Sequence, residues 1–341
     1  MFDIITSEGQ TDLTEAEYAK LKDLLDDYVR IPVGRADYIK QKDLPIECGP
    51  APLSWGGEGH WDTREDSQPV GQAYRRLAYG KSYNDLNHLR RFSWPFSGYH
   101  MASFDLEGAE KDMTNCSGHS ISLYGSRFVE TRKKTPDWLR PTLERRFGEA
   151  GFLIDGEVVN FDLHAITARL YTFYKVGVTK ILSGDNPTWL EIGSGYGTTS
   201  KEVKTRFPNT NMFLLDLAES LVFPYIQLNI TLPAYEHKLI DKCSAEDMVN
   251  PNIIKYVPAH MYDLVPHSIV DVAFNGTSFP EMAPIQRTHY SKFLSQALKG
   301  DGFLAEQNDH YSPELVEFLT LKADYITGTP PWNRIRIYHK Q

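Results

Sequence analysis

Residues 189–200 read Trp-Leu-Glu-Ile-Gly-Ser-Gly-Tyr-Gly-Thr-Thr-Ser. An apolar run leads into three alternating glycines, Gly193, Gly195 and Gly197, and a polar trio leads out into a helical pattern. This order predicts the end of a buried parallel strand, a tight turn and the start of a helix. Glycine permits a positive φ and has no Cβ, so a ligand can lie almost against the chain. Because free N–H groups at a helix start favour electron-rich groups, we expect a ligand-binding turn here.

The spacing of the glycines indicates which kind of ligand the turn binds. A dinucleotide-binding turn has the pattern Gly-x-Gly-x-x-Gly, whose third glycine allows close packing of helix and strand. Here Thr198 occupies that third position, and the glycines fall at every second residue. Glu191 stands just before the first glycine, and a second apolar run, residues 212–215, ends at Asp216. An acid at the tip of a second strand can bind both hydroxyls of a ribose.

Glu191, the alternating glycines and Asp216 together resemble the S-adenosylmethionine site of class I methyltransferases. The resemblance implies an α/β fold, a Rossmann-like sheet of seven strands with the last one antiparallel and with helices on both faces. It implies S-adenosyl-L-methionine as the cofactor, with Glu191 orienting the methionine part, the glycines beneath the cofactor and Asp216 on its ribose. The cofactor-binding residues expected on this basis are Glu191, Gly193, Ser194, Gly195, Gly197, Asp216, Leu217, Met261 and Asn275.

The composition is that of an ordinary globular protein. The 341 residues can hold one large domain or two smaller ones, and 41% of them are hydrophobic. A formal net charge of −9 argues against a general nucleic-acid-binding surface. Three distant cysteines give neither a disulfide framework nor a zinc-binding spacing. With no signal-peptide pattern and no apolar run near the ~20 residues of a membrane helix, we expect a cytoplasmic protein without a membrane or nucleic-acid partner.

The first part of the chain, residues 1–151, is predicted to be an accessory segment ahead of a methyltransferase domain at residues 152–341. Thr14 and Glu17 have capping-box spacing and predict a helix that begins there. Most of the segment after this helix is irregular and rich in aromatic residues, glycine and proline. A loop interrupted by glycines carries Trp55 and Trp61, and it could be a lid, a sugar-binding platform or a structural loop. Three basic clusters could be solvated surface or could contact a phosphate; they are residues 74–76, 90–91 and 132–134.

The second part of the chain alternates strands with helices. Met261 follows the expected third strand, where relatives contact the adenine, and Asn275 closes the fourth, which should face the transferred methyl group. Pro224 is expected near the first turn of its helix. After the first two strands, further strands are predicted at residues 253–258, 268–274, 303–307 and 335–338, and helices at residues 163–176, 199–207, 218–230 and 285–298, with another beginning at residue 312.

Three motifs narrow the resemblance further. Residues 163–181, residues 190–197 and the stretch 278–282 with Tyr290 nearby are similar to the sugar O-methyltransferase family, over roughly residues 160–310. That family occurs in surface-polysaccharide and natural-product gene sets, so the resemblance implies a sugar or glycoside as the acceptor.

A sugar hydroxyl is a poor nucleophile, so a general base should take its proton as the new bond forms. The base must lie at the exits of the fourth and fifth strands, and the candidates there are His310, Glu281 and His289, with Asp309 behind them. A purely structural role explains each of these residues equally well. Glu281 could instead anchor sugar hydroxyls or cap its helix.

A divalent metal that binds the acceptor diol is left open. The pairs 309–310 and 246–247 carry side chains that could serve as ligands, but no metal-binding spacing stands out. No metal ligand is therefore assigned.

Three other functions stay open. A methyltransferase that acts on a peptide or another non-sugar molecule, at oxygen or nitrogen, would keep the fold and change only the acceptor. A nicotinamide oxidoreductase would keep a related sheet, but Thr198 and the alternating glycines oppose it. A non-catalytic protein of the same fold would have no need of an intact ligand turn with both acids. The acceptor's identity and a homo-oligomeric state are likewise undecided.

Overall fold

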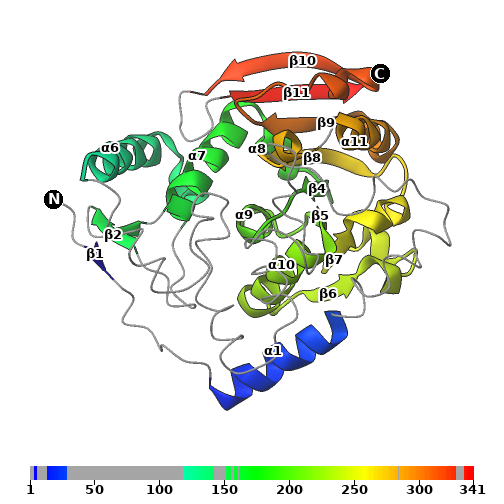
Figure 1. Ribbon diagram of the computed structural model, residues 1–341, viewed down its shortest axis with the longest axis horizontal. Coiled ribbons are helices and arrows are strands. Elements are labelled where there is room, and N and C mark those ends of the chain that lie inside the picture. Colours follow the sequence, from blue (N-terminus) through cyan, green and yellow to red (C-terminus); the bar gives the residue numbers. More distant parts are fainter. Residues whose placement is uncertain are drawn as a thin grey trace, which may run out of the picture.

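The structure is a computed structural model that describes residues 4–5, 14–28, 118–141, 151–154, 157–159, 161–282, 284–327 and 334–341. Its described strands form two sheets (Figure 1). The small one is antiparallel and consists of β1 (Ile4–Ile5), β2 (Gly151–Ile154) and β3 (Glu157–Val159). It lies on the same side of the molecule as helix α6 (Gly118–Lys134) (Figure 1).

The large sheet has eight strands in the order β10-β11-β9-β8-β4-β5-β7-β6. Neighbouring strands from β9 through to β6 pair in parallel, whereas β11 pairs antiparallel with both β9 and β10. The strands are β4 (Thr188–Ile192), β5 (Asn211–Asp216), β6 (Glu236–Leu239), β7 (Ile253–Pro258), β8 (Val270–Gly276), β9 (Leu298–Gln307), β10 (Leu319–Ile326) and β11 (Arg334–Lys340).

The seven strands from β10 to β7 match the predicted seven-stranded sheet, with the last strand in the chain antiparallel, although no residues were assigned to β10 from the sequence. The predicted fold class is therefore confirmed. The eighth strand, β6, is an addition at the edge beyond β7. No strand was predicted there from the sequence, because three of its four residues, Glu236, His237 and Lys238, are polar.

The centre of the sheet is closed to water on both faces. All five residues of β4 are buried, as expected for a parallel strand that is covered on both sides. On one face the Trp189 and Phe274 rings stack with centroids 5.5 Å apart, and Phe173 from the helix above meets them at 5.6 and 4.9 Å. This aromatic cluster fixes the helix of residues 161–175 against the strands that carry the glycine turn and Asn275.

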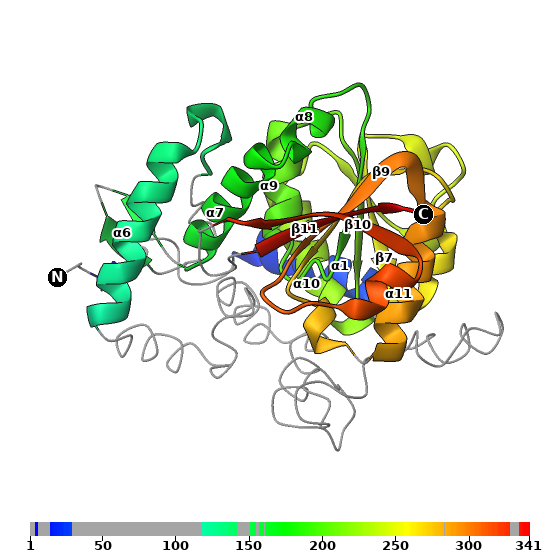
Figure 2. The same cartoon turned by 90° about the horizontal axis from the view of Figure 1, so that it is seen from above.

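Helices cover both faces of the sheet (Figure 2). One face carries α7 to α10, and the other carries α11 (Pro284–Ala297). The helices of the first face are α7 (Phe161–Lys175), α8 (Val178–Leu182), α9 (Thr198–Arg206) and α10 (Ala218–Thr231). Among the described helices none is long and apolar enough to cross a membrane.

Helix α1 (Glu15–Tyr28) packs against α10, which lies far from it in the sequence (Figure 1). Its predicted capping box is present, since the Thr14 N–H donates to Glu17 at 2.9 Å and the Glu17 N–H donates to Thr14 Oγ1 at 3.2 Å. The Tyr28 hydroxyl donates to the carbonyl of Ala218, and Tyr225 donates to Asp27 at 3.0 Å. The first helix of the expected accessory segment is thus anchored on the large sheet's own helices.

Other predictions for residues 1–151 are not tested by the structure. The domain boundary stays a prediction, and Trp55, Trp61 and the basic clusters at residues 74–76 and 90–91 lie outside the described residues. The third basic cluster forms the last turn of α6, where Lys134 pairs with Glu130.

Three local predictions were wrong. Pro224 lies in the interior of α10, beyond its first turn, where its ring packs on the glycine turn. Strand β9 begins at Leu298, ahead of the start predicted at residue 303. The helix expected after Ser312 is a single 3₁₀ segment, Pro313–Glu317, which leads directly into β10.

Candidate functional site

The glycine turn, residues 193–197, connects β4 to α9 at the carboxyl edge of the sheet. All three glycines have positive φ, +73° at Gly193, +52° at Gly195 and +88° at Gly197, as the sequence predicted. The N–H of Gly193 donates to the carbonyl of Leu215 at 2.8 Å, which ties the turn to the end of β5. The N–H of Gly197 donates to the carbonyl of Ser194 at 2.8 Å and closes the turn.

Two of the glycines are also required by packing within the protein. A Cβ on Gly193 would overlap the side chain of Ser278, and a Cβ on Gly197 would lie 2.8 Å from Cβ of Pro224. The sequence suggested that these positions leave room for a ligand. In the structure, parts of the same chain occupy the space beside them.

Asp216, the last residue of β5, is linked to the glycine turn by its carboxylate. One oxygen accepts the N–H of Gly195 at 2.7 Å, and the other accepts the N–H of Leu217 at 2.7 Å. Burial raises the pKa of Asp216 to about 6, although these two backbone donors and Ser194 act to lower it. A carboxylate has about four acceptor positions. The residue is partly exposed, so the carboxylate keeps acceptor capacity for a hydroxyl of a ribose.

Glu191 points into the protein, beneath the first turn of α9. It is 3% exposed, and its Oε2 accepts the hydroxyl of Ser200 at 2.5 Å, while Ser200 accepts the indole N–H of Trp189 at 3.2 Å. Burial raises the pKa of Glu191 to about 7, against the lowering effect of Ser200 and of the positive charge of Arg169. The predicted role of Glu191 in orienting the methionine part of a cofactor stays a prediction.

Asn275 joins the carboxyl ends of three strands. Its side-chain N–H donates to the carbonyl of Ile192 at 3.0 Å, and its Oδ1 accepts from Asn308 at 3.2 Å and from the N–H of Phe279 at 3.3 Å. The residue is fully buried, and its amide also donates to Ser278. These bonds fix the edge that faces the glycine turn, so a direct contact between Asn275 and a cofactor stays a prediction.

Met261 lies where the sequence placed it, just beyond β7. It belongs to a 3₁₀ segment, Ala259–Leu264, and its own φ of −110° and ψ of 17° are not helical. Its side chain is buried. The expected contact with adenine is not tested by these features.

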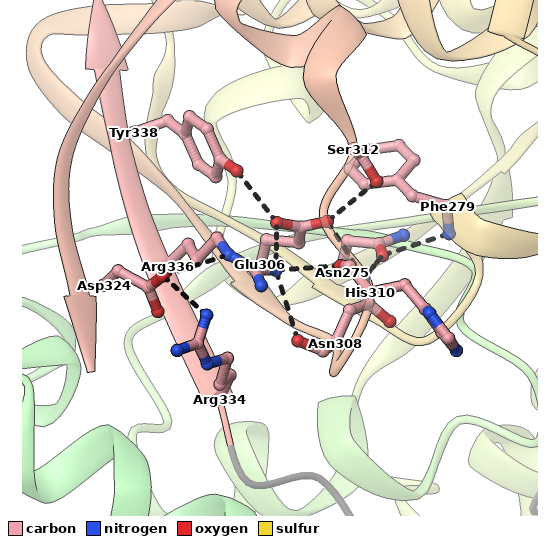
Figure 3. A network of polar contacts seen from close by, with 10 residues as sticks. All are labelled: Asn275, Phe279, Glu306, Asn308, His310, Ser312, Asp324, Arg334, Arg336 and Tyr338. Carbon is pink, nitrogen blue, oxygen red and sulfur yellow. Dashed lines mark hydrogen bonds and ion pairs between the residues drawn. The ribbon is translucent and has the colours of Figure 1, made fainter. Parts of the chain in front are cut away.

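The three candidate bases come from three different elements. His310 follows β9 and is exposed, and only its backbone carbonyl takes part in the polar network of Figure 3, accepting from Arg336 at 2.8 Å. The ring of His310 points away from Glu306 (Figure 3). His289 lies on α11, where its ring stands edge-to-face on Tyr262 with centroids 4.7 Å apart. Glu281 is the last residue of the 3₁₀ segment Phe279–Glu281, and its side chain lies outside what the structure describes.

A buried network around Glu306 was missed by the sequence reasoning (Figure 3). Glu306 accepts from the Tyr338 hydroxyl at 3.0 Å, from Ser312 at 3.1 Å and from Asn308 at 3.2 Å. The guanidinium of Arg336, which only donates, lies 3.4 Å from the same carboxylate. Burial raises the pKa of Glu306 while Arg336 lowers it. The signal in the sequence was the run of polar residues Glu306, Gln307 and Asn308 at the end of β9. Only the residues that follow this run, Asp309 and His310, were considered as candidates from the sequence.

Arg169 is the other residue that the sequence reasoning missed. It extends from α7 to the carboxyl edge, where Nε donates to Gln307 at 3.0 Å and Nη1 donates to Thr199 at 2.6 Å. Nothing in its helical pattern distinguishes it from a surface arginine. It brings a positive charge close to Glu191, at the ends of β4, β8 and β9.

Among the residues that the structure describes, no group of three histidine, cysteine or acidic side chains is arranged to hold a metal ion. The two pairs considered as ligand sources belong to different edges of the sheet. Residues 309–310 follow the carboxyl end of β9, whereas residues 246–247 adjoin Met248, whose carbonyl accepts from Asn211 at the amino end of β5. The two pairs do not combine into one site.

Comparison with known proteins gives a weak likeness to methyltransferases. No protein-family model matches the chain, and no curated protein matches it. Three of the solved structures similar to it are a precorrin-6y C5,15-methyltransferase from Geobacter metallireducens, a TehB-like SAM-dependent methyltransferase from Corynebacterium glutamicum and the mitomycin 7-O-methyltransferase MmcR.

These three are 16%, 12% and 12% identical to the chain, with TM-scores of 0.33, 0.34 and 0.33. The matches cover 50%, 52% and 53% of this chain and 88%, 97% and 57% of the other chains. TM-scores this low carry no argument about function, which has to come from the strand order and from the site itself.

Proposed function

We propose that the protein is an S-adenosylmethionine-dependent O-methyltransferase that methylates a hydroxyl of a sugar or glycoside. The observation that supports this most is the pairing of Asp216 with the glycine turn. An acid at the end of β5 accepts the N–H of Gly195 and keeps acceptor positions for a ligand, at the carboxyl edge of a parallel sheet. Ligands of open α/β sheets bind at this edge.

The residues at this edge fit such a cofactor. Asp216 would hold the ribose hydroxyls, and the turn with Gly193, Ser194, Gly195 and Gly197 would lie beneath the ligand. The hydroxyl of Ser194 is buried next to the carboxylate of Asp216, so the turn and the acid would form one wall of the cofactor site. Glu191, Leu217, Met261 and Asn275 would complete the surroundings. When bound, S-adenosylmethionine supplies an electrophilic methyl group.

The protein's own contribution would be to position the acceptor and to take its proton. Holding the hydroxyl oxygen in line with the methyl group removes much of the entropic barrier. His310, Glu281 and His289 remain the candidate bases, and of the two histidines His310, which follows β9, is the exposed one. Whichever residue acts must reach within hydrogen-bond distance of the acceptor hydroxyl.

The choice of a sugar rests on the motif at residues 278–282 and on Tyr290. In the structure the Phe279 and Tyr290 rings pack with centroids 6.1 Å apart, so the motif and the helix after it form one unit. This unit is fixed to the edge by Asn275 and Ser278, beside the expected position of the methyl group. A non-sugar acceptor, methylated at oxygen or nitrogen, is the alternative that keeps every other part of the proposal. A divalent metal as a second cofactor, and a homo-oligomer, are compatible with it.

The test is isothermal titration calorimetry of the purified protein with S-adenosylhomocysteine, compared with NADH. We expect S-adenosylhomocysteine to bind and Asp216→Ala to abolish the binding, while Asp301→Ala, at an exposed acid near the start of β9, leaves it intact. Binding of NADH instead, or no binding of either ligand, would overturn the methyltransferase proposal. Turnover of a panel of sugars and glycosides with S-adenosylmethionine then separates the sugar from the non-sugar acceptor and from a non-catalytic protein.

A further inference from the structure

Two polar groups at the carboxyl ends of β8 and β9 have no role in the proposed methyl transfer: the guanidinium of Arg169, from α7, and the amide of Gln307, from β9. Arg169 is held there by two hydrogen bonds, to Gln307 and Thr199, and its guanidinium lies over the ring of Phe274 at 5.0 Å from the centroid. Arg169 is partly exposed, although its helix is otherwise almost entirely buried around it. A positive charge is thus fixed in one orientation at this edge.

Strand β8 leaves room for the guanidinium of Arg169 because its last residue is a glycine. Gly276 ends β8, and a Cβ at this position would lie 2.7 Å from Nη2 of Arg169 and 3.0 Å from the ring of Phe274. Any other residue at 276 would displace the guanidinium. Gly276 is also the register partner of Gln307, the last residue of β9, so the two strands end at the same level directly beneath Arg169.

The orientation of the Gln307 amide follows from this contact. A guanidinium only donates hydrogen bonds, so the atom that faces Arg169 must be the amide oxygen. The amide nitrogen of Gln307 then points elsewhere, and it is buried without a hydrogen-bond partner among the described residues. A buried donor of this kind destabilises a fold unless a ligand or water provides an acceptor.

We propose that Arg169 and Gln307 form a carboxylate-binding subsite, which takes the α-carboxylate of a ligand that carries an amino-acid group. The inference rests on the proposed function, since the ligand would be the cofactor and the carboxylate that of its methionine part. The planar guanidinium matches a carboxylate in shape and charge, and the Gln307 N–H supplies a further donor. Glu191 lies on the same face of the sheet but points beneath α9, which leaves Arg169 as the charged group that a carboxylate can meet there.

The experiment compares two ligands that differ only in the carboxylate, S-adenosylmethionine and decarboxylated S-adenosylmethionine. Calorimetry measures both dissociation constants on the wild type and on two variants, Arg169→Gln and Gln307→Glu. The second variant keeps an oxygen facing Arg169, but it replaces the amide donor by a negative charge. Arg140→Gln is the matched control, because Arg140 pairs with Asp137 near α6 and not at the carboxyl edge. Circular dichroism checks that each variant is folded.

We expect the wild type to bind S-adenosylmethionine about 10- to 100-fold more tightly than the decarboxylated ligand, the range for a charge-assisted hydrogen bond. In Arg169→Gln the ratio should fall towards about one, and in Gln307→Glu it should fall at least as far, because the new carboxylate repels the carboxylate of S-adenosylmethionine. The Arg140→Gln control should keep the wild-type ratio.

Equal affinity of the wild type for the two ligands would overturn the subsite and leave the proposed function standing. If Arg169→Gln weakened both ligands by the same factor, Arg169 would be a structural counter-charge for Glu191 and the subsite would also be overturned. Failure of the wild type to bind either ligand would instead overturn the proposed function. Should Arg169→Gln not fold, the ligand ratio in the wild type and in Gln307→Glu still decides.

Discussion

Replacing Glu191 by Gln should make the stability of the protein less dependent on pH. Glu191 is 3% exposed, and burial raises its pKa from 4.5 to about 7. Because the pKa in the folded state lies above that of the unfolded chain, the protonated carboxyl stabilises the fold fully at low pH. This contribution is lost as the pH rises from the unfolded towards the folded value, since the unfolded chain releases the proton first.

The size of the effect follows from the two pKa values. Integrating the titration of one group between them gives a loss of about 2.5 kcal/mol in the free energy of unfolding from about pH 5 to about pH 8. A glutamine at this position does not titrate, and it can still present an oxygen to the hydroxyl of Ser200. The variant should therefore gain about 2.5 kcal/mol relative to the wild type over the same pH range, whatever its absolute stability.

Urea denaturation at the two pH values measures this gain. Glu246→Gln is the control, since Glu246 is exposed in the connection between β6 and β7, and its difference from the wild type should be nearly the same at both pH values. If the difference between Glu191→Gln and the wild type were also the same at both, the carboxyl of Glu191 would titrate alike in both states, and the argument from burial would be wrong.

Two further substitutions test the local structure of the edge. Gly193→Ala should destabilise the protein by about 1–3 kcal/mol because of its positive φ and its overlap with Ser278, and Ser278→Gly should recover part of that loss in the double variant, as thermal unfolding would show. Glu306→Gln should cost about 2 kcal/mol in urea denaturation, because its amide would face donors from Tyr338, Ser312 and Asn308, and an unchanged midpoint would mean that the network is not needed for stability.

The fold was predictable because its signals are local. The run into the glycines, the acid that ends the second strand and the alternation in β11 each reflect burial or turn geometry within a few residues. β6 was missed because an edge strand of polar residues has no apolar pattern. The position of Pro224 was wrong for the opposite reason, since its ring fills the space beside Gly197, a contact between distant residues that no local pattern shows.

The site was predictable only where one residue carries the signal. Asp216 meets the glycine turn as expected, because parallel neighbours must end at the same edge. Arg169 and Gln307 are far apart in the sequence and meet through the packing of α7 on the sheet, so neither stood out. The candidate bases were chosen from strand exits alone, and this criterion does not distinguish the exposed ring of His310 from the ring of His289 packed on Tyr262.

Buried charges are sorted between the two edges of the sheet, and this sorting separates structural charges from the one that a ligand can reach. Lys204 and Lys255 lie near the amino ends of β5 and β7, where backbone carbonyls accept from them. The acids whose pKa burial raises, Glu191, Asp216 and Glu306, all lie at the carboxyl ends of strands. Burial disfavours the ionised form of each acid, and nearby donors and positive charges oppose this effect. Of the three, only Asp216 is partly exposed, so it is the acid of this edge that a ligand with hydroxyl groups can reach, whereas Glu191 and Glu306 bond to side chains within the protein.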